Sequence, residues 1–148
     1  MLHSIGITNC TVTGDTRFDR VVESAAVVKP IPLIEKFKAG NKVLIAGSTW
    51  KEDEQLILSA CKNFSLHPSP FKLIIAPHEI NAIKIKELER LFSGMNTARF
   101  SEANEKIIAG SQVLIIDNIG MLSAIYQYGT GAFIGGGFRK PGCIHAGK

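Results

Sequence analysis

Val43-Leu44-Ile45-Ala46-Gly47-Ser48-Thr49 is the stretch of this 148-residue chain that decides its fold class. Its first four residues are apolar without alternation, and its last three are small or polar. A short continuous apolar run that ends in this way is typical of a strand buried on both faces of a parallel sheet. We therefore expect a strand here that ends close to Gly47.

Further apolar runs repeat this pattern along the chain. They cover residues 73–76, 113–116 and 132–134, and a shorter strand is expected over residues 97–100. Amphipathic helical patterns separate the runs, and this alternation predicts βαβ units. The expected fold is α/β, a Rossmann-like parallel sheet with helices on both faces.

One amphipathic helix is expected after each of the first two strands, those at residues 43–46 and 73–76. The earlier helix carries Glu52, Asp53 and Glu54 in its first turn, where acidic residues interact favourably with the helix dipole. The simplest interpretation of these three acids is a solvated helix start. The later helix covers residues 80–92, and Ile83 is expected on its apolar face.

The composition excludes several classes of protein. Hydrophobic residues make up 45% of the chain and charged residues 20%, as in a folded globular domain. No apolar run reaches the ~18 residues of a membrane-spanning helix, and the amino terminus lacks the pattern of a signal peptide. The net charge of +4 is spread evenly along the chain. We therefore expect no nucleic-acid partner.

The three cysteines also limit the chemistry. Cys10, Cys61 and Cys143 stand far apart, and no pair of them has the spacing of a zinc ligand set. Their odd number argues against a disulfide framework. Cys61 falls within an apolar helical pattern and is expected in the core. We expect neither a metal site nor a cofactor.

The residues that follow the expected strands form the candidate ligand site. In parallel α/β sheets, ligands bind beyond the carboxyl ends of the strands. Glycines and backbone amides at such ends suit a phosphate group, although Ser48 or Thr49 would serve equally well as a helix cap. A P-loop and a dinucleotide-binding fingerprint are both missing. The strand ends are Gly47-Ser48-Thr49, Pro77-His78-Glu79, Asp117-Asn118 and Gly135-Gly136-Gly137.

Several of these residues leave two interpretations open. His78 is either a hydrogen-bond donor to a ligand or half of a solvated pair with Glu79. Asp117 stands among apolar neighbours, and capping the following helix together with Asn118 would be a sufficient role for it. His145 lies in a glycine-rich segment, where it either binds an anion or is simply exposed.

The order of these motifs resembles a known enzyme family. The chain is similar to the carboxyl-terminal half of the 3-deoxy-D-manno-octulosonic acid (Kdo) transferases, the lipid A glycosyltransferases of Gram-negative bacteria. Each motif alone is weak, whereas their order and spacing together are specific. The series consists of residues 13–21 (TGDTRFDRV), 46–50 (AGSTW), 75–79 (IAPHE), 116–122 (IDNIGML) and 133–138 (FIGGGF).

The resemblance implies a two-domain glycosyltransferase of the GT-B type. Its amino-terminal domain would take the lipid A precursor and supply the general base of an inverting, metal-independent reaction, so no catalytic residue is assigned here. Residues 1–40 would be a linker leading into the domain. Residues 41–148 would be a truncated Rossmann-like nucleotide-sugar-binding domain, and its expected partner is CMP-Kdo or CMP.

The resemblance also assigns donor-binding residues. Arg17 would face the phosphate or carboxylate of the donor, and amides at residues 47–49 and 135–137 would stabilise charge on the departing phosphate. In this chain His78 follows Pro77 directly, without the arginine of the family motif. The remaining assigned positions are Gly47, Ser48, Thr49, Gly120, Met121, Gly135, Gly136 and His145.

The resemblance further implies a location and a state. The full-length protein would work at the cytoplasmic face of the inner membrane, while the fragment would be soluble and inactive alone. The alternatives are a non-catalytic nucleotide-binding module of Rossmann-like fold and the donor domain of another GT-B glycosyltransferase. A truncated parallel sheet would leave an open edge, which favours self-association.

Overall fold

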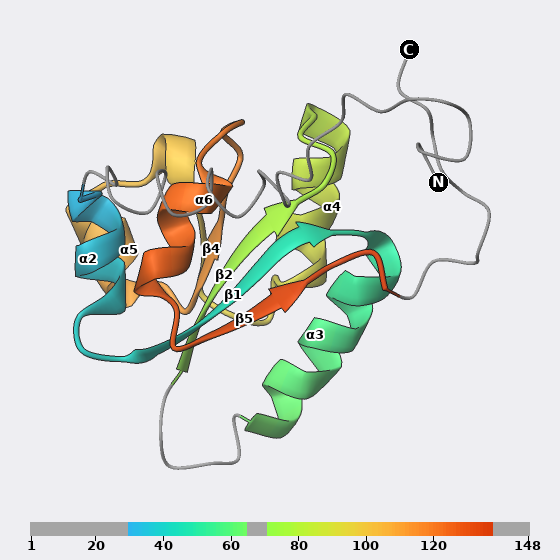
Figure 1. Ribbon diagram of the computed structural model, residues 1–148, viewed down its shortest axis with the longest axis horizontal. Helices are drawn as coiled ribbons and strands as arrows, with labels where there is room; N and C mark the ends of the chain where they lie inside the picture. Colours follow the sequence, from blue (N-terminus) through green and yellow to red (C-terminus); the bar gives the residue numbers. More distant parts are fainter. Residues whose placement is uncertain (1–29, 65–70, 138–148) are drawn as a thin grey trace, which may run out of the picture.

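Five parallel strands form the sheet of the computed structural model, which describes residues 30–64 and 71–137 (Figure 1). The strand order is β3-β4-β2-β1-β5. The prediction of a parallel α/β sheet with helices on both faces is confirmed. The strands are β1 (Lys42–Thr49), β2 (Phe71–Pro77), β3 (Thr97–Arg99), β4 (Val113–Ile115) and β5 (Gly131–Ile134).

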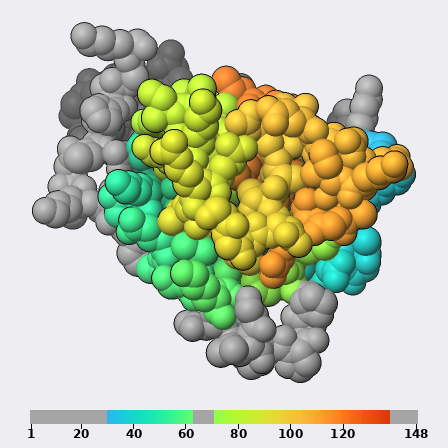
Figure 2. Space-filling view, turned by 180° about the vertical axis from the view of Figure 1, so that it is seen from behind, coloured from blue at the N-terminus to red at the C-terminus, as the bar shows by residue number. Residues whose placement is uncertain are grey.

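Helices cover both faces of this sheet. One face packs against α3 (Lys51–Phe64) and α4 (Ala82–Leu91). Figure 2 views the molecule from behind, and it shows the side chains of α3 and α4 together with those of the chain that follows α4. The other face packs against α2 (Pro32–Lys38), α5 (Glu105–Gly110) and α6 (Leu122–Ile125). Two short 3₁₀ turns, η2 (Phe100–Glu102) and η3 (Tyr126–Tyr128), complete the described elements.

Alternating side chains of the strands divide the core into two clusters. Ile45 and Ile74 face α2, α5 and α6, whereas Ala46 and Ile75 face α3 and α4. Each fully buried isoleucine contributes roughly 1.5–3 kcal/mol relative to an exposed one. The continuous apolar runs in the sequence reflect this burial on both faces. The core also includes Ile34 and Phe37 of α2, which precede residue 41 and are fully buried.

The apolar face of α4 differs from the expected one. Ile83 is 74% exposed, while Ile85 and Leu88 are buried. Asn81 caps this helix, because its side-chain oxygen accepts a hydrogen bond from the Lys84 amide at 2.9 Å. Ile83 lies two residues before Ile85, about 200° around the helix axis, so it falls on the solvent side when Ile85 and Leu88 are buried.

Cys61 lies in the core, as predicted. Its side chain is buried on α3, and burial raises the pKa of the thiol to about 11. The thiol is therefore protonated near neutral pH and is a poor nucleophile. Cys10 and Cys143 lie outside the described residues, as do Arg17 and His145.

Two further observations concern the described ranges as a whole. None of their helices is long and apolar enough to cross a membrane. Within the same ranges, no three His, Cys, Asp or Glu side chains gather into a group that would hold a metal ion. The expectation that the protein uses no metal and no cofactor stays a prediction.

Candidate functional site

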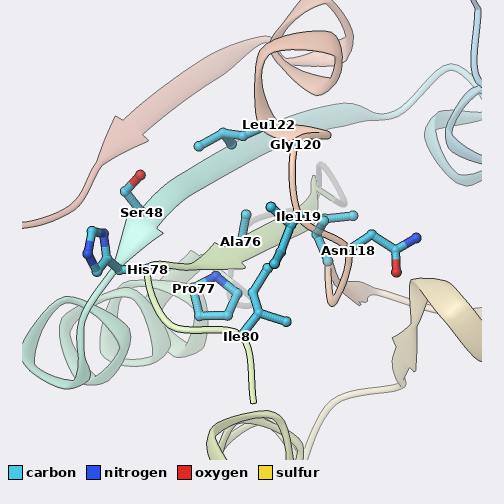
Figure 3. Close-up of a pocket in the computed structure, with 10 residues that line it drawn as sticks. Ser48, Ala76, Pro77, His78, Ile80, Asn118, Ile119, Gly120 and Leu122 are labelled. Carbon is cyan, nitrogen blue, oxygen red and sulfur yellow. The ribbon is translucent and has the colours of Figure 1, made fainter. Parts of the chain in front are cut away.

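A cleft of about 270 Å³ opens at the carboxyl ends of β1, β2 and β4. Figure 3 shows Ser48 and His78 at one end of it and Asn118 and Ile119 on the far side. Polar side chains stand at the rim of a largely apolar surface. The lining residues are Ser48, Ala76, Pro77, His78, Ile80, Ile116, Asn118, Ile119, Gly120 and Leu122.

Ser48 enters the cleft through an irregularity at the end of β1. The pairing of β1 with β2 shifts register between Gly47 and Thr49, as in a β-bulge. Ser48 has a φ of 53°, in the left-handed region that residues with a side chain rarely adopt. Backbone strain of this kind persists only where the surrounding structure holds it in place, and it is found most often at functional sites.

Thr49 faces away from the cleft and belongs to a buried polar network. Its hydroxyl donates to Glu54 Oε1 at 3.2 Å, and Lys84 Nζ donates to Glu54 Oε2 at 2.7 Å. Thr49 and Glu54 are 0% and 2% exposed. The expectation that Glu54 is solvated is therefore wrong, because the carboxylate ties α3 to both β1 and α4.

Asp53 is likewise buried, against the same expectation. Its Oδ2 accepts hydrogen bonds from the amides of Trp50 and Gly136, each at 2.9 Å. The bond to Trp50 is half of a capping box, in which the third helical residue reaches back to the residue before the helix. Within residues 30–64 and 71–137, no group donates a hydrogen bond to the buried Oδ1.

The glycine turn after β5 packs against this carboxylate without spare room. A Cβ on Gly135 would lie 2.4 Å from the Ser48 carbonyl oxygen and 2.7 Å from Asp53 Oδ2. The Gly135 amide donates to the Gly47 carbonyl at 2.8 Å, and the Gly136 amide is held by Asp53. These two amides, which the resemblance assigns to the donor phosphate, are thus used within the chain.

Gly47 is required by packing above the end of β1. A Cβ there would lie 2.2 Å from the Tyr126 hydroxyl oxygen and 2.9 Å from Leu122 Cδ1. Partial burial raises the pKa of Tyr126, so the phenol stays protonated at neutral pH. Gly47 therefore shapes the wall of the cleft rather than lining it.

His78 stands at the rim of the cleft on the end of β2. Its amide donates to the Thr49 carbonyl at 2.9 Å, which ties the ends of β1 and β2 together. The imidazole stacks on the indole of Trp50, with ring centroids 4.3 Å apart and an interplanar angle of 27°. Glu79 is exposed and does not line the cleft.

Asp117 does not cap the helix that follows it. Its carboxylate accepts hydrogen bonds from the Ser101 amide, at 3.0 Å, and from the Ser101 hydroxyl. Arg99 Nε lies 4.0 Å from the same carboxylate. The residue before α6 is Met121, and its side chain makes no capping bond. Asp117 instead joins the end of β4 to the chain after β3.

The structure divides the expected site residues into groups. Ser48, Pro77, His78 and Gly120 line the cleft. The others with described positions form its supporting walls, and Met121 packs beside the core. Asn118, which the sequence offers both as a strand-end residue and as a helix cap, lines the cleft, whereas the apolar lining residues were missed because exposed and buried isoleucines look alike in a sequence. The supporting residues are Gly47, Thr49, Gly135 and Gly136.

Together these features define the class of the protein. The strand order reverses direction at β1, where β2 lies on one side and β5 on the other. A parallel sheet with helices on both faces and a cleft at its carboxyl edge is a Rossmann-like α/β domain.

Among known proteins, the chain is similar in sequence to transferases of one name. The chain is 26% identical over 140 residues to the 3-deoxy-D-manno-octulosonic acid transferase of Rickettsia bellii, which covers 95% of this chain. It is 30% identical over 105 residues, or 71% of this chain, to the transferase of the same name from Aquifex aeolicus. No family model matches the chain. The resemblance to the Kdo transferases is confirmed by these relatives.

A solved structure confirms the fold. The C-terminal CMP-Kdo binding domain of WaaA from Acinetobacter baumannii superimposes with a TM-score of 0.63 at 21% identity. The match covers 84% of this chain and 61% of that domain. The chain spans 33% of the length of the Rickettsia bellii relative and 28% of the Aquifex aeolicus one.

Proposed function

We propose that this chain is the part of a Kdo transferase that binds the sugar-nucleotide donor, CMP-Kdo, in the cleft at the ends of β1, β2 and β4. The observation that carries the proposal is the similarity to Kdo transferases along 95% of the chain. The proposal is supported by the fold that the chain shares with the Acinetobacter baumannii domain, whose name states CMP-Kdo binding.

The geometry of the cleft agrees with a nucleotide ligand. Its apolar lining, which includes Pro77 and Ile119, suits the faces of a base, and Ser48 and Asn118 offer hydrogen-bond groups at the rim. The chain has a net charge of +4, which favours the approach of an anion. Binding would therefore combine packing on the base with polar contacts from the strand ends.

A nucleotide titration followed by NMR tests this proposal. We expect CMP to bind more tightly than UMP, with shifts of amide signals concentrated at Ser48, His78 and Gly120. The matched control is a second cavity, between α3 and the end of α4, which includes Leu58 and Met95 and should not respond. Equal affinities for CMP and UMP, or shifts spread over both cavities, would contradict the proposal.

The activity of the whole protein follows as a wider proposal. The full-length protein would be an inverting GT-B glycosyltransferase that transfers Kdo to a lipid A precursor at the cytoplasmic face of the inner membrane. The acceptor and the general base would belong to an amino-terminal domain, so we expect no transfer by the 148-residue chain alone. Kdo transfer by this chain in an assay with CMP-Kdo and lipid A precursor would contradict that expectation.

A second candidate role is self-association through β5. This strand lies at one edge of the described sheet and pairs there with β1 alone. Ile134 at its end is 72% exposed, and such edges favour strand pairing between chains. Light scattering should show a dimer that Ile134→Lys dissociates, whereas a monomer at high concentration would rule the role out.

A further inference from the structure

Trp50 lies between the glycine turn after β5 and the imidazole of His78. On one side, a Cβ built on Gly136 would be 3.8 Å from the indole Nε1 and 3.9 Å from Cδ1, so the turn runs along the edge of the ring. On the other side, the His78 ring stacks on the indole with centroids 4.3 Å apart. The indole therefore links the end of β5 to the rim of the cleft.

The backbone of Trp50 is itself fixed. Its amide donates to Asp53 Oδ2, and the same oxygen holds the Gly136 amide. Asp53 is fully buried, so its carboxylate has no room to follow a moving loop. One buried oxygen thus sets the position of the tryptophan and of the glycine turn beside it.

His78 needs such support because its side chain is exposed. An exposed imidazole turns about two side-chain bonds, and the second has broad preferences. The hydrogen bond from its backbone amide to the Thr49 carbonyl fixes the backbone but leaves the ring unrestrained. Stacking on a flat aromatic surface removes most of this freedom, and a preformed contact then binds its ligand at a lower entropic cost.

We propose that Trp50 is a positioning residue, which holds the imidazole of His78 at the rim of the cleft in the orientation that meets a nucleotide. The part that concerns the ligand rests on the proposed function, whereas the placement of the ring does not. An aromatic side chain suits this position, because a flat ring stacks on His78 while its edge lies along the glycine turn.

The first test measures the ring placement without a ligand. Protons of an imidazole stacked over an indole are shielded, so the His78 ring signals should lie upfield and show NOEs to the Trp50 ring in the unmodified chain. Trp50→Leu should return the His78 signals to ordinary positions, and Trp50→Phe should retain most of the shift. Unshifted His78 signals without these NOEs in the unmodified chain would overturn the proposal, even if CMP binds.

The second test asks whether Trp50 acts through His78. Trp50→Leu should weaken CMP binding about five- to tenfold, and Trp50→Phe should restore most of that loss. In a chain that already carries His78→Ala, Trp50→Leu should cost less than twofold more, since its partner is gone. An equal loss in both backgrounds would mean that Trp50 acts on the ligand or on the fold directly, and would overturn the proposal.

A control variant separates this effect from general damage. Ile83→Ala on α4 replaces a side chain that is 74% exposed and should leave the CMP affinity unchanged. If the unmodified chain binds no CMP, the proposed function fails, and the NMR measurement still decides whether Trp50 holds the His78 ring.

Discussion

The two sides of the cleft are built in contrasting ways. On the crowded side, at the end of β1, a Cβ on Gly135 would meet the backbone of Ser48 and Thr49, and a Cβ on Gly47 would meet the side chains of Leu122 and Tyr126. On the open side, between β4 and α6, Ile119 is 88% exposed and a Cβ on Gly120 would meet nothing within 4 Å. One cleft therefore joins a rigid wall to an accessible one.

This difference assigns separate tasks to the two sides. The crowded side fixes geometry through backbone contacts and buried carboxylates, so substitutions there should act on stability first. The open side presents side chains that pack against little else, so substitutions there should act on ligand binding alone. Four substitutions test this division, in order of decreasing effect on stability.

The largest effect is expected from Gly135→Ala on the crowded side. The added methyl would lie 2.4 Å from the Ser48 carbonyl oxygen and 2.7 Å from Thr49 Cα, and backbone atoms cannot easily yield. We expect a loss of about 3 kcal/mol in the free energy of unfolding, measured by urea denaturation. Gly137→Ala, on the same turn with open space around it, is the matched control and should be nearly neutral.

Glu54→Gln should have the next largest effect. The amide can still accept from Thr49, but it leaves the Lys84 ammonium, whose side chain is 13% exposed, without its charged partner. A hydrogen bond to a charged group at a buried site contributes roughly 2 kcal/mol, which thermal and urea unfolding should register. Glu52→Gln in the same helical turn is exposed and serves as the control. Equal losses from both variants would contradict the buried network.

Ser48→Gly should separate stability from binding. Glycine adopts a positive φ without strain, so the variant should gain about 1 kcal/mol in the free energy of unfolding. It also removes the hydroxyl from the cleft, and CMP affinity should fall. Ser48→Ala keeps the strain at a φ of 53° and removes the same hydroxyl, so it should lose affinity without the gain. A destabilised Ser48→Gly variant would show that the bulge carries no strain.

Ile119→Ser on the open side should leave stability unchanged. A side chain that is 88% exposed contributes little to folding, and the change in unfolding free energy should stay within about 0.5 kcal/mol. CMP binding should weaken several-fold, because the variant removes apolar surface from the cleft. A loss of stability comparable to that of Glu54→Gln would remove the distinction between the two sides.

The sequence predicts the sheet well because burial on both faces leaves a local signal. The runs at residues 43–46 and 113–116 contain only apolar residues; the first lies within β1, and residues 113–115 of the second form β4. The short helix α5 was not predicted, since its six residues are too few to show a clear period. The expected apolar face of α4 was wrong at Ile83, because Ile85 and Leu88 are the buried residues and Ile83 lies on nearly the opposite side of the helix from Ile85.

The candidate site was harder to predict because its contacts are distant in the sequence. Acidic residues in a first helical turn are usually solvated, and Asp53 departs from this rule through Gly136, which lies 83 residues further along. Asp117 likewise bonds Ser101, 16 residues earlier, instead of the helix beside it. By contrast, Ser48, Pro77 and His78 follow strands in the sequence and all line the cleft, because strand ends in a parallel sheet share one edge.

The late position of β5 in the chain has a consequence for the order of assembly during synthesis. Val43 donates its amide to Thr130, 87 residues later, where the chain enters β5. A ribosome therefore makes β1, α3, β2 and α4 long before the strand that completes the crowded wall. Closing so long a loop is slow, because its entropy is lost before the distant contacts form. The glycine turn after β5 is therefore the last part of the crowded wall to be synthesised.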